Sequence, residues 1–145
     1  MANKTAYAPT TVITLTAAED LNPNLFVMMD GHVCGANKKA IGATFQGTLS
    51  GLDAPIAIAG SVVLIKSGAA ITVTDAPVPV VSDSAGKAIA ATTFSATTPT
   101  GATPVTSTGA NPAMTLAGSV LPQAINGYAL DSASGANELI RVVLV

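Results

Sequence analysis

Apolar and polar residues alternate in short runs along most of this chain, and turn residues separate the runs. Runs rich in β-branched residues occur at TVITLT (11–16), SVVLIK (61–66), AITVT (70–74) and VPVVS (78–82), and further ones at KAIAATT (87–93), NGYAL (126–130) and ELIRVVLV (138–145). Short strands at close spacing, bounded by Gly, Pro, Asn, Asp and Ser, are typical of all-β proteins. The pattern predicts an all-β domain of short antiparallel strands, arranged as a small β-sandwich or an open barrel.

The segment LFVMMDGHVC (25–34) carries the clearest local signal, because Asp-Gly favours a type I′ hairpin turn. With Asp30 and Gly31 in the loop, Met29 would lie opposite His32. One face of the hairpin would then carry Leu25, Val27, Met29, His32 and Cys34, and the other Phe26, Met28 and Val33. Both faces are apolar, which a sheet with one face in water does not explain.

Three segments give weaker signals. GATFQGTLSG (42–51) is expected to be a strand between glycines, and DAPIAIAGS (53–61) is compatible with a single helical turn. Pro77 and Pro79 favour an edge or irregular strand for 78–82, since proline cannot donate to a sheet ladder.

The last strand of the chain is apolar on both sides, like the hairpin. Ile140, Val142 and Leu144 face one way, and Leu139, Arg141 and Val143 face the other. If one face packs in the domain's own core, the other is most simply covered by another subunit, which predicts a symmetric oligomer. Candidate residues for the subunit interface are Phe26, Met28, Val33, Leu139 and Val143.

Two segments lie outside this strand pattern. Residues 1–10 are expected to form an extended N-terminal arm, because Pro9 biases Ala8 toward extended backbone. Residues 92–118 form a long Thr/Pro-rich insertion, too rich in Pro and Gly for a helix. We therefore expect an arm followed by a single domain, residues 11–145, that contains the insertion loop.

The composition excludes several classes of protein. Charged residues make up 10% of the chain, against about 25% in ordinary globular domains. No run of about 20 apolar residues predicts a membrane span, and the first residues contain no signal-peptide core. The net charge of −2 argues against nucleic acid as a partner, and a single Cys excludes an internal disulfide.

No motif in the chain indicates catalysis, a metal or a cofactor. His32 is the single histidine, and no G-x-S-x-G motif surrounds any serine. SDSAGKA (82–88) lacks the first glycine and the final hydroxyl residue of a phosphate-binding loop. His32 and Cys34 are two residues apart, but a zinc site needs three or four ligands. We expect a protein that is not an enzyme, with no cofactor and no metal.

The order of several segments resembles the capsid decoration (cement) proteins of tailed bacteriophages. The C-terminal NGYALDSASGANELIRVVLV is similar to the closing segment of that family, in which a Gly-x-Ala-Leu strand and a short turn precede a final V-x-L strand. GHVCGANKKAIGATFQGTLSG and AITVTDAPVPVVSDSAGKAIA resemble its middle, and TVITLTAAEDLNPNLFVMMDG its first strand and hairpin. The insertion at 92–118 departs from the shorter form common in the family.

This resemblance implies a structural virion protein made in the bacterial cytoplasm. It implies a homotrimer on the outside of the expanded phage head, at local three-fold positions, that stabilises contacts between major capsid proteins. The arm, with Lys4, Tyr7 and Pro9, would contact the capsid by adding a strand to a neighbour's sheet edge. The alternative is another phage surface or fibre module that binds host glycans, although five aromatic residues, three Phe and two Tyr, give little surface for stacking sugars.

Overall fold

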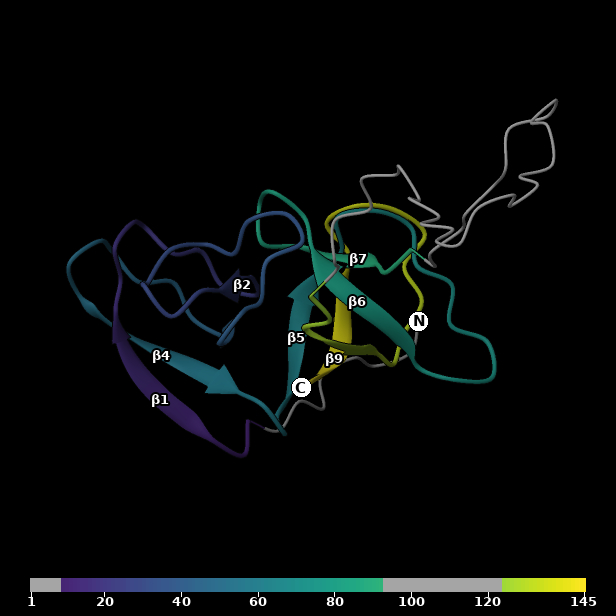
Figure 1. Ribbon diagram of the computed structural model, residues 1–145, viewed down its shortest axis with the longest axis horizontal. Coiled ribbons are helices and arrows are strands. Elements are labelled where there is room, and N and C mark those ends of the chain that lie inside the picture. Colours follow the sequence, from purple (N-terminus) through teal and green to yellow (C-terminus); the bar gives the residue numbers. More distant parts are fainter. Residues whose placement is uncertain (1–8, 93–123) are drawn as a thin grey trace, which may run out of the picture. The chain divides into compact units, whose positions relative to one another are not determined.

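The computed structural model describes residues 9–92 and 124–145, in which the chain forms nine β-strands and no helix (Figure 1). The strands are β1 (Val12–Thr16), β2 (Phe26–Val27), β3 (Gly42–Thr44), β4 (Asp53–Ile58), β5 (Val62–Lys66), β6 (Val78–Ser82), β7 (Ala88–Ala90), β8 (Gly127–Ala129) and β9 (Leu139–Leu144). They form two sheets, and every strand pair is antiparallel. The expected all-β class is therefore confirmed.

Both segments outside the strand pattern fall largely beyond the described residues. Residues 1–8 of the expected arm and 93–118 of the expected insertion lie there. The arm and the insertion therefore stay predictions. All nine strands belong to one unit of the chain.

The first sheet has four strands in the order β1-β4-β3-β2. β1 pairs with β4 along its full length, from Val12 opposite Ala57 to Thr16 opposite Asp53. β3 ends at Thr44, because the next position of β4 that would donate to it is Pro55, which has no amide hydrogen. Because β1 comes first in this order, it is an edge strand, with one side paired to β4 and the other side open.

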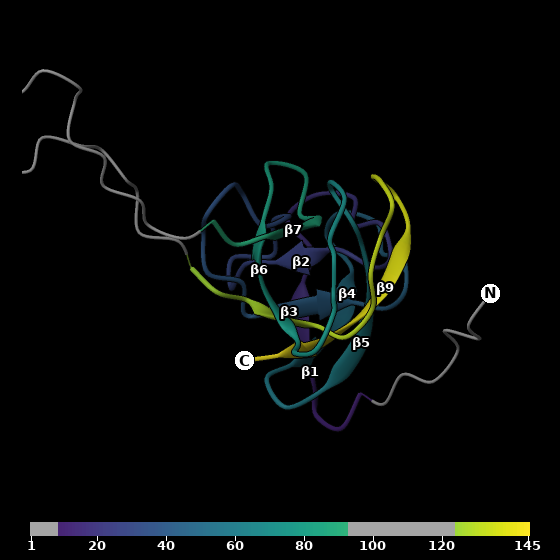
Figure 2. The same cartoon turned by 90° about the vertical axis from the view of Figure 1, so that its right-hand side faces the viewer.

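The second sheet has five strands in the order β5-β9-β8-β6-β7. Figures 1 and 2, drawn at right angles, both show β9 running beside β5. The sheet curls so that its two edges meet at one end, where Ser67 after β5 forms a parallel bridge with Ala88 of β7. The amide of Gly68 donates to the carbonyl of Ala88 at 2.7 Å and extends this closure.

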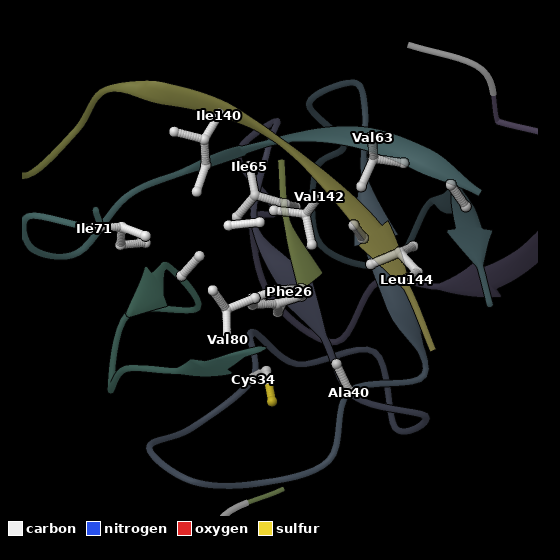
Figure 3. Close-up of a cluster of buried hydrophobic side chains, with 14 of the residues drawn as sticks. Phe26, Cys34, Ala40, Val63, Ile65, Ile71, Val80, Ile140, Val142 and Leu144 are labelled. Carbon is white, nitrogen blue, oxygen red and sulfur yellow. The ribbon is translucent and has the colours of Figure 1, made fainter. Parts of the chain in front are cut away.

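The main hydrophobic core lies between the two sheets. Alternate residues of β5 and β9 project into it, and Figure 3 shows them around Phe26 of β2, the largest of the fully buried side chains. The core consists of Phe26, Cys34, Ala40, Ala43, Ala57, Val63, Ile65, Ile71, Val80, Ala88, Ala129, Ala133, Ile140, Val142 and Leu144. Phe26 and two small residues of the first sheet, Ala43 and Ala57, therefore pack against aliphatic residues of the second.

A second, smaller core lies on the other face of the four-stranded sheet. It consists of Ala17, Leu21, Val27, Ala54 and Ile56, with Ile13, Leu15, Val33, Ile41 and Ile58 partly buried against it. Phe26 and Cys34 of the hairpin enter the main core, whereas Val27 and Val33 enter the second. The base of the hairpin, at Phe26, Val27 and Cys34, is thus covered within the chain, whereas Met29 next to the turn is exposed. The expectation that Phe26 lies at a subunit interface was wrong, because its side chain is fully buried and has no surface left for a partner.

The hairpin turn also differs from its expected form. The amide of Gly31 donates to the carbonyl of Met28, and the amide of Met28 donates to the carbonyl of His32. A type I′ turn requires a positive φ at both central residues. Gly31 has a φ of 82°, but Asp30 does not have a positive φ. The loop therefore has three residues, Met29 to Gly31, and Val27 rather than Met28 lies opposite Val33. A left-handed glycine that closes a three-residue loop explains the shift by one residue.

Two other local predictions were wrong. Residues 53–58 form strand β4, not a helical turn, because alternate side chains reach the two cores on either face of the sheet. Residues 70–74 form no strand, and Ile71 alone makes an isolated bridge, to Ala133.

Strand β6 lies inside its sheet, between β8 and β7, rather than at an edge. Pro79 is tolerated there because its nitrogen faces Ala91, one residue past the end of β7. Proline at that position forgoes one bond, to the carbonyl of Ala91 beyond the end of β7, while its own carbonyl still accepts from the amide of Ala91 at 2.9 Å.

Candidate interaction surfaces

His32 and Cys34, the two residues whose spacing could suit a metal, lie in different environments. His32 is exposed beside the hairpin turn, with its Nδ1 3.6 Å from Oε1 of Glu19. Cys34 is fully buried in the main core, and its thiol donates to the carbonyl of Lys38 at 3.4 Å. Among residues 9–92 and 124–145, no group of three or more His, Cys, Asp or Glu side chains could hold a metal ion.

Burial raises the pKa of the Cys34 thiol above its ordinary value. A hydrogen bond with Ser82 acts in the opposite direction but is the weaker influence. The folded protein therefore favours the protonated thiol, which is a poor nucleophile. Cys34 behaves as a small core residue, and the described residues offer no catalytic arrangement around it.

The outward face of the five-stranded sheet carries apolar side chains on neighbouring strands. Cross-strand pairing places one residue from each of four neighbouring strands in a single row. The row runs from Val62 of β5 through Val143 of β9 and Tyr128 of β8 to Pro79 of β6. Tyr128 is 40% exposed, and the other three side chains are partly buried. We call these four residues the outward row.

Arg141, the only arginine of the chain, lies on the same face, two residues before Val143. Its Nε and Nη2 donate to the two carboxylate oxygens of Asp131 at 2.9 and 2.8 Å, and its amide donates to the same carboxylate. The hydrogen bonds that Arg141 donates to Asp131 raise the pKa of the guanidinium, which stays charged in any case. Two-point pairing holds the guanidinium in one orientation beside the outward row.

The structure separates the expected interface residues into two groups. Leu139 and Val143 lie on the outward face of β9, as the alternation predicted. Met28 is partly buried against the main core and Val33 against the second core, far along the chain from β9. Sequence reasoning missed Val62, Tyr128 and Pro79, which join Val143 through strand pairing and have no local signal of their own.

The open side of β1 is a second possible contact surface. Ile13 and Leu15 use their amide and carbonyl groups for pairing with β4. Those of Val12 and Thr14 point away from the sheet, and in the described part of the chain they have no hydrogen-bond partner. Unpaired groups along an uncharged edge can accept an added strand. Pro9 precedes this edge and is partly buried, whereas Lys4 and Tyr7 lie outside the described residues.

Comparison with known proteins finds no matching family model, no characterised protein that matches significantly and no solved structure that does so. Within the described ranges, no helix is long and apolar enough to cross a membrane.

Proposed function

We propose that this protein is a structural component of a tailed-phage head, a decoration protein that binds the outer surface of the expanded shell as a homotrimer. It sits at local three-fold positions and stabilises contacts between major capsid proteins. The proposal rests first on the order of segments that resembles the decoration family. The confirmed all-β class is compatible with it.

Among the structural observations, the outward row supports the proposal most. A row of four side chains across four strands, with Val143 at its centre and Tyr128 exposed, gives a sheet face that water solvates poorly. Tyr and Arg are the residue types that contribute most to protein interfaces, and this face holds Tyr128 and an oriented Arg141. We assign this face to contact between subunits.

Binding to a shell does not need many charges if several weak contacts act together. A trimer presents three copies of each contact, and linked contacts raise apparent affinity by roughly 10²–10⁴-fold. Main-chain hydrogen bonds along the open edge at Val12 and Thr14 would add strength without ionic groups. The glycan-binding alternative has less support, because Tyr128 is the one exposed aromatic side chain among the described residues.

Sedimentation with shells tests the proposal. Purified protein is mixed with shells assembled from the major capsid protein of the same phage, either expanded or unexpanded, and its molar mass in solution is measured by light scattering. We expect binding to expanded shells with little binding to unexpanded ones, and self-association toward a trimer. A protein that stays monomeric at high concentration and does not pellet with expanded shells would overturn the proposal.

A further inference from the structure

The three most exposed large apolar side chains of the described residues lie in two turns that are bonded to the same short segment. Met29 is 68% exposed, Leu49 64% and Leu52 56%. The amide of Ala17 donates to the carbonyl of Leu52, and the amide of Ala18 donates to the carbonyl of Gly31. The hairpin turn and the turn at residues 49–52 therefore flank Ala17 and Ala18 on either side. We call Met29, Leu49 and Leu52 the apolar tip.

Both turns are held rigidly. The amide of Leu52 donates to the carbonyl of Leu49 at 3.2 Å, and Gly51, with a φ of 81°, donates to Ala17 at 2.7 Å. A Cβ on Gly31 would lie 2.2 Å from the carbonyl oxygen of Thr16, so only glycine permits the hairpin turn to pack this closely. Because the turns are ordered before any contact, binding through them costs little conformational entropy.

Carboxylates surround the apolar tip. Glu19, Asp20, Asp30 and Asp53 lie in the segments 16–20, 28–32 and 48–53 that form it, and these segments contain no lysine or arginine. They are half of the eight acidic residues of the chain. His32, which lies beside Glu19, is the one residue of these segments that can carry positive charge. The tip therefore combines exposed apolar side chains with a negative rim.

Each carboxylate is anchored through one oxygen. Oδ1 of Asp20 accepts from the amide of Ser50 at 2.8 Å, and Oδ1 of Asp30 accepts from the amide of His32 at 3.1 Å. Oε1 of Glu19 accepts from the amide of Val33 at 2.7 Å. In the described part of the chain, the second oxygen of each accepts no hydrogen bond. The rim thus has a fixed position and still presents acceptors outward.

We propose that the apolar tip docks onto a protein surface with a shallow apolar socket edged by lysine or arginine side chains. Apolar side chains at the centre of an interface supply binding energy, and rim charges of opposite sign raise the association rate. This inference rests on the proposed function, since we identify the socket with the outer surface of the expanded shell. The outward row then binds sister subunits, and the tip binds the shell together with the open edge of β1.

Binding to expanded shells tests the tip. The variant Met29→Ser/Leu49→Ser/Leu52→Ser should bind about tenfold more weakly or worse, since truncating a central interface residue commonly costs more than 1 kcal/mol. Its melting temperature should stay close to that of the wild type, because all three side chains are exposed. The matched control is Val145→Ser, an exposed apolar residue that follows β9 and lies outside every contact surface named above, which should bind as the wild type does.

The rim is tested by changes that remove charge and keep the anchoring oxygen. Asp20→Asn/Asp30→Asn should slow association and make binding less sensitive to salt, while Asp75→Asn in a distant exposed turn should change neither. If the wild-type protein and the triple serine variant bind expanded shells equally well, the docking role of the apolar tip is overturned and the proposed function stands. Wild-type protein that fails to bind expanded shells overturns the proposed function itself.

Discussion

Phe26 has a different role in the structure from the one that the sequence pattern predicted. In the apolar hairpin it is a natural candidate for a subunit contact, but in the structure it is fully buried between the two sheets. Only three phenylalanines occur in the chain, so a single ring provides an unusually large share of the core volume. Its position makes it a stability residue rather than a binding residue.

Replacing Phe26 with Ala should destabilise the protein by about 3–5 kcal/mol, because a large side chain is lost and the core cannot fully collapse around the cavity. Urea denaturation followed by circular dichroism measures the change. Tyr128→Ala on the outward row should cost far less stability and is the matched control. Unchanged stability of the Phe26→Ala protein would contradict the assignment of this ring to the core.

Cys34 should react with thiol reagents only slowly at neutral pH and quickly after unfolding. Burial blocks access and raises the pKa of the thiol, so the reactive thiolate is scarce in the folded state. The stabilising effect of the protonated thiol is present at neutral pH and is lost as the pH rises past the ordinary thiol pKa. Time courses with a chromogenic disulfide, with and without denaturant, measure this. Rapid labelling of the native protein would contradict the burial of Cys34.

At the scale of elements, β1 shows that position in a ladder matters more than strand propensity. Its five residues alternate between groups that bond to β4 and groups that face outward. Neighbouring residues of the same strand therefore differ in their tolerance of proline. Pro79 in β6 already shows that this fold accepts proline where its nitrogen faces a residue beyond the end of the neighbouring strand.

Thr14→Pro should cost little more than about 1 kcal/mol, since its amide faces away from β4, whereas Ile13→Pro should cost about 3 kcal/mol or more. The second change removes the bond to Ile56 and also the partly buried side chain of Ile13. Thermal unfolding of the two proteins gives the comparison. Equal melting temperatures for the two proteins would mean that β1 does not pair in the register described.

At the scale of the whole molecule, the two faces of β9 have different roles. Ile140, Val142 and Leu144 build the main core, and Val143 lies in the outward row between Val62 and Tyr128. A lysine at Val143 would place an unpaired charge at the centre of the proposed subunit contact without entering the core.

Val143→Lys should therefore abolish self-association while leaving the fold intact, because burying an unpaired charge in an interface is strongly unfavourable. Light scattering measures the molar mass, and circular dichroism checks the fold. Thr74→Lys, on an exposed turn, is the matched control and should associate normally. If Val143→Lys associates as the wild type does, the subunit contact lies elsewhere on the molecule.

Local pattern identified most strands and most turns. Segments 11–16, 61–66, 78–82 and 138–145 were expected as strands and contain β1, β5, β6 and β9. The turn at residues 83–87 is stabilised locally too, because Asp83 accepts from the amides of Ala85 and Lys87. These features depend on neighbours along the chain, which is why the sequence predicts them.

The apolar tip and the outward row had no comparable signal. Met29 lies 20 or more positions from Leu49 and Leu52 in the sequence, and their two turns lie beside the same segment only because both bond to Ala17 and Ala18. Val62 and Tyr128 join Val143 only through the strand order β5-β9-β8. Contacts between distant segments depend on pairing that no single stretch of sequence specifies.

The sequence by itself determined the all-β class, the alternation that divides β9 into two faces, and the scarcity of charge. Tertiary structure decided which faces are covered. It buried Phe26, Val27 and Cys34 of the hairpin within one chain, placed β6 inside a sheet despite Pro79, and left the outward row uncovered by the strands. The physical reason is that side-chain alternation is a local property of a strand, whereas burial depends on which other strands and turns the rest of the chain brings against it.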